Sequence, residues 1–256
     1  MPAISATLIT HNEAANIARA IRSLAPADEI VLVDSGSTDG TCEIASDLGA
    51  RVVRHPWEGY ARQKNFAASE AKHDWILSLD GDEEFDDVSQ RAIERWKSPT
   101  PDCAGYRFAR CARYLGRWIR HSGWYPDYKV RLYHRRRGRW QGEYVHESVK
   151  VEGRVETMRG TILHYTCDSL EDHRRRIEVY TDLAAAEMAA RGAPLNPLRR
   201  LTAPSWAFGR AYLLHLGFLD GTPGFWIARM ASRYVARKHV KWEDLLKAAK
   251  VSSGTK

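Results

Sequence analysis

The sequence predicts an α/β protein, with a mixed, mostly parallel β-sheet flanked by helices and a helical appendage at the C-terminus. In roughly the first hundred residues, short apolar segments typical of buried parallel strands alternate with segments of helical periodicity. Beyond them, several segments alternate in polarity or carry many β-branched and aromatic residues, as strands of a mixed sheet do. Because alternating strands and helices imply right-handed βαβ crossovers, the N-terminal strands are expected to be parallel.

The first two strands are expected at residues 4–10 and 29–34, which are apolar segments that end in polar residues. Asn12 is a favourable N-cap for a helix after the first strand. Residues 35–40, after the second strand, are rich in turn and capping residues and lead into a short helix that Gly49 ends.

The remaining elements follow from the same periodicities. A short strand at residues 52–53 and a helix at 61–71 precede an apolar strand at 75–79. A helix opened by Ser169 has Asp172 near its N3 position, which approximates a capping box. Between these parts we expect one more helix and four strands, at residues 86–97, 105–113, 129–134, 143–151 and 157–165.

The strand at residues 75–79 runs directly into a cluster of carboxylates, Asp80, Asp82, Glu83 and Glu84. Such a cluster repels itself unless a cation, solvent or a basic partner lies close by. Gly81 permits a tight turn, so Asp80 and Asp82 can face the same hard cation, for which Mg²⁺ or Mn²⁺ with a substrate phosphate is suited. The alternative is a solvated acidic turn after a strand.

Polar side chains follow three strands of the expected parallel sheet. They lie at residues 10–13, 34–39 and 80–82. In open α/β sheets, ligands bind at the edge formed by the carboxyl ends of the strands. Each carboxylate could by itself be a helix cap, and for Asp39 we favour that interpretation, but their recurrence predicts a site for phosphate and a metal.

Composition narrows the class of partner. The chain has 256 residues and a net charge of +7, which favours an anionic partner such as nucleic acid, a phosphorylated small molecule or an anionic membrane surface. Its four cysteines form no C-x-x-C pair and are expected to be reduced thiols. With no signal peptide and no apolar run long enough to span a membrane, we expect a cytoplasmic protein.

Three short motifs in the N-terminal half are similar to motifs of a known family. They are Thr-His-Asn-Glu at residues 10–13, Val-Asp-Ser-Gly-Ser-Thr-Asp-Gly-Thr at 33–41, and Leu-Asp-Gly-Asp-Glu at 79–83. In this order and spacing the chain resembles the family-2 glycosyltransferases with the GT-A fold. More narrowly, it resembles the branch that includes lipopolysaccharide-core β-1,4-glucosyltransferases. The resemblance is strong over roughly the first hundred residues.

The resemblance implies a GT-A catalytic domain over residues 1–167, with a nucleotide-sugar half at 1–101 and an acceptor half at 102–167. Residues 168–256 would then be a helical C-terminal region, for which association with the membrane is one alternative. The implied activity is metal-dependent, inverting transfer of a sugar, most simply glucose from UDP-glucose, to an inner-core saccharide of lipopolysaccharide or lipooligosaccharide. This would take place at the cytoplasmic face of the inner membrane.

The same resemblance assigns roles in the donor site. Asp34 would contact the nucleotide base, and Asp80-Gly81-Asp82 would be the D-x-D motif that holds Mg²⁺ or Mn²⁺. His164 resembles a histidine that supplements the metal shell in some relatives, although a lone histidine at a strand end is more often structural. Other residues implied to line the substrate are Thr10, Asn12, Glu13, Ser35, Asp39, Lys64 and Arg131. Lys64 would lie near the diphosphate or be a solvated helix lysine.

On the acceptor side, an inverting mechanism needs a carboxylate that takes the proton of the attacking hydroxyl. Glu147 is the favoured base, next to His146 where many relatives carry an acidic residue, and Asp127 is its rival. The basic run at residues 133–140 is either a solvated hairpin loop or a patch for an anionic acceptor, to which arginine forks are suited.

The C-terminal region, residues 198–247, interleaves aromatic and basic residues. Such helices either lie in a membrane interface, pack on the catalytic domain or pair in a dimer, and the oligomeric state stays open. Two other classes also remain open: a basic nucleic-acid-binding protein and a non-catalytic membrane-associated scaffold. A nucleotidyltransferase is a closer alternative, but no Gly-rich phosphate loop follows the first strand.

Overall fold

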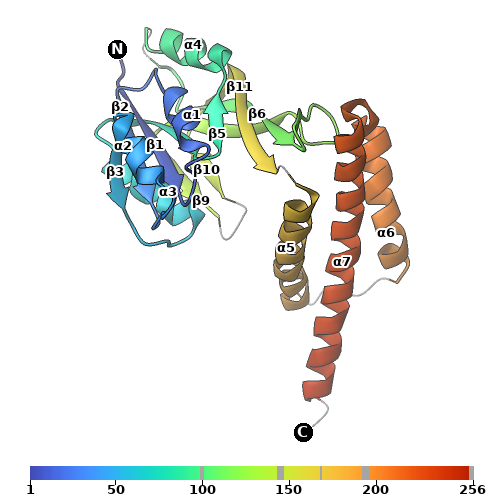
Figure 1. Ribbon diagram of the computed structural model, residues 1–256. Helices are drawn as coiled ribbons and strands as arrows, with labels where there is room; N and C mark the ends of the chain where they lie inside the picture. The colour runs from blue at the N-terminus through green and yellow to red at the C-terminus, as the bar shows by residue number, and fades with distance from the viewer. Residues whose placement is uncertain (99–100, 143–146, 168, 192–196, 254–256) are drawn as a thin grey trace. The chain divides into compact units, whose positions relative to one another are not determined.

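The computed structural model describes residues 1–98, 101–142, 147–167, 169–191 and 197–253. The chain forms two compact units, which we call the sheet unit and the helical unit (Figure 1). The sheet unit comprises Met1–Cys111 and Pro126–Tyr165, and the helical unit comprises Ala112–Tyr125 and Thr166–Lys256. The segment Ala112–Tyr125, which lies within the expected acceptor half, therefore groups with the C-terminal helices.

Four parallel strands form one half of the main sheet, in the order β3 (Arg51–Arg54), β2 (Glu29–Asp34), β1 (Ile4–Thr10) and β4 (Trp75–Asp80). β1 is buried along its whole length, which explains its unbroken apolar pattern. The prediction of a mixed α/β sheet with a parallel N-terminal part is confirmed.

The register of these strands brings their carboxyl ends to one edge. Thr10 lies opposite Asp34 on one side of β1, and Ile9 lies opposite Asp80 on the other. The polar residues that follow β1, β2 and β4 therefore meet, as the sequence predicts for parallel strands.

The other half of the main sheet contains antiparallel pairs. β8 (Asp127–His134) pairs with β4 and with β6 (Gly105–Tyr114), and β11 (Val155–Cys167) pairs with β5 (Glu83–Phe85). The sequence missed β5, because three residues after a turn are too few for a periodicity to be read. It also missed two short strands, which are β7 (Arg117–Trp118) beside β6 and β9 (Gly138–Gln141). β9 pairs with β10 (Ser148–Val151), which is the described part of the strand expected at residues 143–151, since residues 143–146 lie outside the described residues.

Four helices belong to the sheet unit: α1 (Ile17–Arg22), α2 (Thr41–Asp47), α3 (Tyr60–Glu70) and α4 (Asp87–Trp96). The prediction that Asn12 caps the first helix is wrong, because Asn16 holds that position. Asn12 instead has a left-handed φ of +57°, and its side chain accepts a hydrogen bond from the backbone N–H of Thr38 at 2.9 Å.

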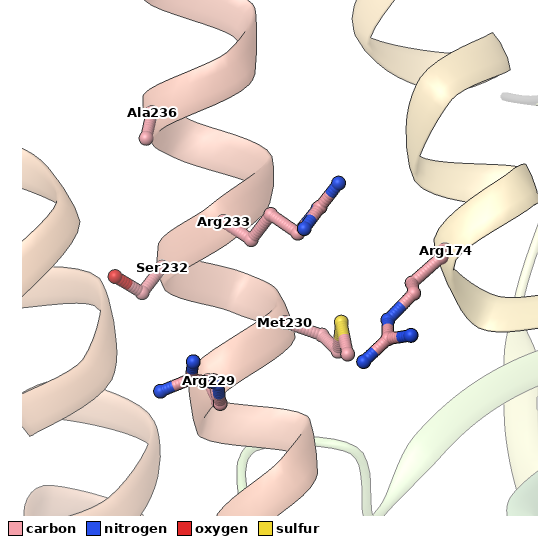
Figure 2. A pocket seen from close by; sticks show the side chains of 6 residues that line it. All are labelled: Arg174, Arg229, Met230, Ser232, Arg233 and Ala236. Carbon is pink, nitrogen blue, oxygen red and sulfur yellow. The ribbon is translucent and has the colours of Figure 1, made fainter. Parts of the chain in front are cut away.

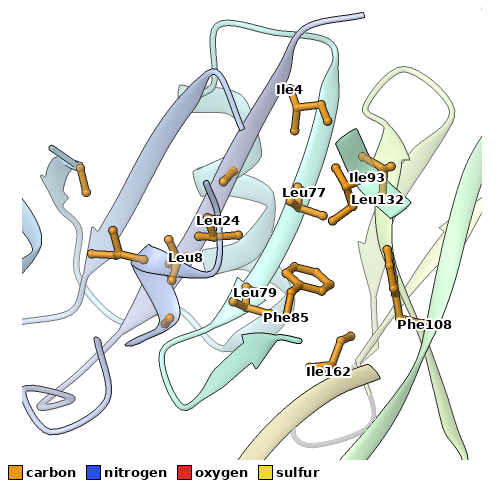
Figure 3. Packing of buried hydrophobic residues seen from close by; sticks show 14 of the residues in the cluster. Ile4, Leu8, Leu24, Leu77, Leu79, Phe85, Ile93, Phe108, Leu132 and Ile162 are labelled. Carbon is orange, nitrogen blue, oxygen red and sulfur yellow. The ribbon is translucent and has the colours of Figure 1, made fainter. Parts of the chain in front are cut away.

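The core of the sheet unit lies between β1, β4 and the antiparallel strands (Figure 3). Phe85 of β5 is buried there and meets Phe108 of β6 edge-on, with 5.0 Å between ring centroids. This packing holds β5, and with it the carboxylates next to it, against the sheet. Other buried members are Ile4, Leu8, Leu24, Leu77, Leu79, Ile93, Leu132 and Ile162.

The helical unit contains α5 (Leu170–Ala190), α6 (Pro197–Gly209), a π-turn η1 (Arg210–Leu214), a 3₁₀ turn η2 (Gly217–Asp220) and α7 (Thr222–Ser253). Ser169 caps α5 by accepting from the backbone N–H of Asp172 at 3.0 Å, as predicted. None of the described helices combines the length and the apolar character that crossing a membrane requires.

The buried residues of α5 are Ile177, Thr181 and Ala185, whereas Tyr180 is exposed.

Gly160 of β11 provides a first prediction. Its φ is +103°, and a Cβ built on it would lie 2.3 Å from the backbone nitrogen of Ser89 at the start of α4. We expect Gly160→Ala to lower the free energy of unfolding by about 3 kcal/mol, because backbone strain adds to a steric overlap that the backbone cannot relieve. Urea unfolding measures this.

Gly49→Ala is the matched control, since Gly49 has a φ of +83° but open space around its Cβ position. It is expected to cost only the conformational strain, about 1 kcal/mol. Equal losses in the two variants would contradict the close approach of β11 to α4.

His173 of α5 provides a second prediction. Burial, helped by the charge of Arg176, lowers the pKa of His173 from 6.5 to about 4, and its Nδ1 lies 2.7 Å from the Tyr114 hydroxyl. Above pH 6.5 the imidazole is neutral in both states. Between that pH and about 4 the unfolded chain takes up the proton first, so stability is lost as the pH falls through this window.

Between pH 7 and pH 4.5, we expect the free energy of unfolding of His173→Gln to fall by about 2 kcal/mol less than that of the wild type, because glutamine does not titrate. Urea unfolding at the two pH values measures this difference. The exposed His11→Gln is the control and is expected to leave the pH dependence unchanged. A wild-type-like pH dependence in His173→Gln would contradict a neutral buried imidazole.

Candidate active site

The carboxyl end of β2 holds the fully buried Asp34. Its carboxylate accepts hydrogen bonds from the backbone N–H groups of Gly36 and Ser37, both at 2.9 Å, and from the Ser37 hydroxyl. Burial raises the pKa of Asp34, but these hydrogen bonds outweigh it and bring that pKa below its ordinary value. Asp34 is therefore a fixed carboxylate whose orientation is set by its own turn.

The loops after β1 and β2 are tied together by side chains. Asn12 donates its backbone N–H to the Ser37 hydroxyl at 2.8 Å, and Glu13 donates its own to the Thr41 hydroxyl at 2.8 Å. Asp39 accepts from Thr41 and from the backbone N–H of Ala14, and the Thr41 hydrogen bond lowers the pKa of Asp39. Asp39 thus joins the loop after β1 to the first residue of α2, although the N-cap position of α2 is held by Gly40 and not by Asp39.

Two further predicted residues lie at this edge. The hydroxyl of Ser35 accepts from the Gln63 amide of α3 at 3.0 Å. The hydroxyl of Thr10 is buried and has no hydrogen-bond partner among the described residues. A buried hydroxyl of this kind is available to a ligand at the edge.

Lys64 of α3 bridges two of the predicted functional carboxylates. It is only 3% exposed, and its Nζ lies 2.8 Å from Asp80 Oδ1 and 3.3 Å from Glu147 Oε1. The same ammonium group lies 4.3 Å from the centroid of the Trp140 ring. The alternative of a solvated helix lysine is therefore wrong.

Arg131 of β8 continues this arrangement on the other side of Asp80. It is 2% exposed, and its Nη2 lies 3.0 Å from Asp80 Oδ2 and 2.5 Å from Glu83 Oε2. Glu83 in turn pairs with Arg110 of β6 at 3.2 Å, and Arg110 pairs with Asp127 at 2.7 Å. The sequence offered Arg131 for the donor diphosphate, but its guanidinium is already engaged by two carboxylates.

These ion pairs form one series of alternating charge, which we call the charge chain: Glu147, Lys64, Asp80, Arg131, Glu83, Arg110, Asp127 and Lys129. Burial alone would raise the pKa of Asp80, but the charges of Lys64 and Arg131 hold it well below its ordinary value. The sequence placed Glu83 in the acidic cluster but did not identify Arg110 as its partner, because nothing in a single sequence pairs a residue with another 27 positions away.

Asp82 and His164 form a separate pair next to the charge chain. Asp82 Oδ2 lies 3.2 Å from His164 Nε2, and the backbone carbonyl of Asp82 accepts from Tyr165 at 3.0 Å. Gly81 brings this turn close to the β1 loop, since a Cβ there would lie 3.1 Å from Glu13 Cγ.

Asp82 offers a carboxylate oxygen, the type of ligand that a hard divalent ion prefers, and His164 offers one imidazole nitrogen beside it. Ligands on adjacent positions of an octahedral Mg²⁺ lie about 3 Å apart, and the Asp82–His164 pair has that separation. Asp80, the other predicted ligand, is held by Lys64 and Arg131 instead. In the described residues the one group of three potential ligands that gather is Asp102, Cys103 and Glu156, so a metal at Asp82 would complete its shell with ligand and water oxygens.

The two candidate bases differ in their surroundings. Asp127 lies between Arg110 and Lys129, and although burial raises its pKa, these two cations bring it below the ordinary value. That makes Asp127 a weak proton acceptor. Glu147 has one cation near it, Lys64, while His146 beside it lies outside the described residues.

The basic run at residues 133–140 fits neither expectation fully. Tyr133 and Trp140 at its ends are buried, and β9 begins within it. Arg135 and Arg136 both pair with Asp74, at 3.1 and 3.0 Å, and the Arg136 side chain is 75% exposed.

The chain resembles known proteins over most of its length. The sequence profile described as glycosyl transferase family 2 matches residues 5–150. A Rickettsia felis protein named an uncharacterized glycosyltransferase is 34% identical over 248 residues, covering 88% of this chain and 84% of that protein. The lipopolysaccharide core biosynthesis glycosyltransferase LpsC of Rhizobium meliloti is 28% identical over 250 residues, covering 92% and 93%.

Among solved structures, glucosyl-3-phosphoglycerate synthase from Mycobacterium tuberculosis, in complex with Mn²⁺ and UDP-glucose, is 25% identical to this chain. The match covers 44% of each chain with a TM-score of 0.36, which is too low to transfer any property to this protein.

The position of Lys64 provides a third prediction. Lys64→Met leaves Asp80 and Glu147 side by side without their shared cation, so we expect the free energy of unfolding at pH 7 to fall by about 2 kcal/mol. Lys72→Met is the control, because the Lys72 side chain is 72% exposed. Urea unfolding compares the two, and equal stability would contradict the bridging role of Lys64.

Proposed function

The chain belongs to glycosyl transferase family 2, and from that premise we propose that it transfers a sugar from a nucleotide diphosphate to a saccharide hydroxyl with inversion at the anomeric carbon. The observation that carries the proposal is the meeting of Asp34, Asp80 and the Asp82–His164 pair at the carboxyl edge of the parallel strands.

On the donor side, Asp34 binds the base and ribose, since its turn holds the carboxylate in one orientation. Asp82 and His164 would hold Mg²⁺ or Mn²⁺, which neutralises the negative charge that develops on the leaving diphosphate. The Thr10 hydroxyl, buried and without a hydrogen-bond partner among the described residues, would hydrogen-bond to the nucleotide sugar. The donor is a UDP-linked hexose, with glucose the favoured sugar on the resemblance described above.

The reaction needs a proton acceptor beside the incoming hydroxyl. The acceptor oxygen attacks the anomeric carbon from the face opposite the diphosphate, and a new glycosidic C–O bond forms. The C–O bond to the diphosphate breaks, and its electron pair leaves with UDP. Glu147 takes the hydroxyl proton, and Lys64 holds that carboxylate next to Asp80.

For the acceptor we propose an inner-core saccharide of lipopolysaccharide or lipooligosaccharide, at the cytoplasmic face of the inner membrane. The similarity to LpsC, whose name places it in lipopolysaccharide core biosynthesis, supports this choice. So do the exposed apolar side chains of the helical unit, which include Leu198, Leu201, Trp206, Leu213, Leu214, Leu216, Phe218 and Leu219. Another polysaccharide or glycolipid is the alternative acceptor.

The fourth prediction tests the base. Glu147→Gln keeps the size of the side chain but cannot accept the proton, so we expect UDP release from UDP-glucose with acceptor to fall at least a hundredfold. Binding of UDP-glucose is expected to stay within about threefold of wild type. Both are measured on the same preparations, by a coupled UDP assay and by titration calorimetry.

Asp127→Asn is the rival variant, and it is expected to retain more activity than Glu147→Gln at equal folded fraction. The assignment of the base would be overturned if Glu147→Gln turned over normally while Asp127→Asn lost the same hundredfold. If the wild-type protein did not bind UDP-glucose at all, the proposed reaction itself would be overturned.

A further inference from the structure

The helical unit has a groove where α5 and α7 meet. Its lining is basic, whereas the edge of the sheet unit described above is rich in carboxylates. It has a volume of about 260 Å³ and is lined by Arg174 of α5 and by Arg229, Met230, Ser232, Arg233 and Ala236 of α7. Figure 2 shows Arg174 and Arg233 reaching from the two helices into the space beside Met230. We call it the arginine groove.

The spacing along α7 explains why these side chains share one face. Arg229, Arg233 and Ala236 lie four and three residues apart, which places them on neighbouring turns of the same side of a helix. α5 packs beside this part of α7 and brings Arg174 to the groove. Three guanidinium groups therefore line one small volume.

Acidic side chains do not balance these charges. Arg233 lies 3.5 Å from Glu178, but Glu178 also pairs with Arg237 at 2.7 Å and with Lys241 at 3.1 Å. Arg174 and Arg229 have no acidic partner among the described residues. A second carboxylate, Asp182, lies 2.8 Å from Lys241. Two carboxylates thus face three cations, and Arg174 and Arg229 add two more positive charges, which leaves the groove positive.

The chemistry of the lining selects a phosphate. A guanidinium fork binds phosphate oxygens in a bidentate manner, and the Ser232 hydroxyl adds one more donor. Met230 and Ala236 give the groove an apolar part, which suits the carbon skeleton next to a phosphate ester. The volume is at the small end for ligand pockets, so it fits a head group rather than a whole nucleotide sugar.

We propose that the arginine groove is an anion site that binds the phosphate group of a phosphate ester. The ester is carried either by a lipid head group or by a soluble phosphorylated compound. This inference does not depend on the proposed transferase reaction, because all of its residues belong to the helical unit.

The test uses the full-length protein and two probes. The first is vesicles of phosphatidylcholine with phosphatidylglycerol, compared with phosphatidylcholine alone, in a co-sedimentation assay. The second is glycerol 3-phosphate in solution, followed by titration calorimetry. The variant Arg174→Ala/Arg229→Ala removes the two arginines without acidic partners and spares the Arg233–Glu178 pair.

The matched control is Arg175→Ala/Arg191→Ala. It removes the same charge from the same unit, and both side chains are exposed, at 72% and 74%. Thermal unfolding of both variants checks that the helical unit stays folded. UDP-glucose binding, measured in parallel, reports on the donor site alone, so a failure of the transferase proposal is seen separately.

We expect the groove variant to bind at least one probe tenfold or more weakly than wild type, and the control to stay within twofold. Loss confined to the phosphatidylglycerol vesicles assigns the lipid source, and loss confined to glycerol 3-phosphate assigns the soluble source. Two results would overturn the proposal. One is equal binding by the groove and control variants to both probes, and the other is wild-type protein that binds neither probe.

Discussion

The neutralisation of buried carboxylates at one sheet edge is the constraint on which the rest of the sheet unit depends. When β4 and β5 pack on the core, Glu83 becomes buried and the Asp80 side chain keeps 23% of its surface exposed. Carboxylates in such surroundings are tolerated only with charged, hydrogen-bonded partners. Three elements supply those partners, with Lys64 from α3, Arg131 from β8 and Arg110 from β6. The charge chain therefore ties the parallel half of the sheet to its antiparallel half.

The same chain explains why a metal is chemically appropriate at this edge. Its eight members alternate in sign, four carboxylates and four cations, so its net charge is zero. A diphosphate bound at this edge would therefore meet no net positive charge from these eight residues. The Asp82–His164 pair, outside the chain and with the separation of two octahedral ligands, is the place where a divalent ion would add that charge.

Much of the frame could be predicted from the sequence, because the buried strands of a parallel sheet have a pattern that is read locally. The predicted bounds of β1, β2 and β4 nearly equal the observed ones. The edge that Asp34 and Asp80 share was also predicted. What could not be predicted depends on partners far along the chain. Examples are the pairing of Glu83 with Arg131, the bridge that Lys64 forms to Glu147 and the role of Asn12 between two loops.

The proposed reaction requires this edge to bind a nucleotide diphosphate through a metal at Asp82. Calorimetric titration of UDP into the protein, with Mn²⁺ and again with EDTA, tests it most directly, beside Asp82→Ala and the exposed control Glu94→Ala. The account predicts that UDP binds wild type and the control only with Mn²⁺ and binds Asp82→Ala at least tenfold more weakly. UDP binding that is the same in EDTA, or unaffected by Asp82→Ala, would contradict it.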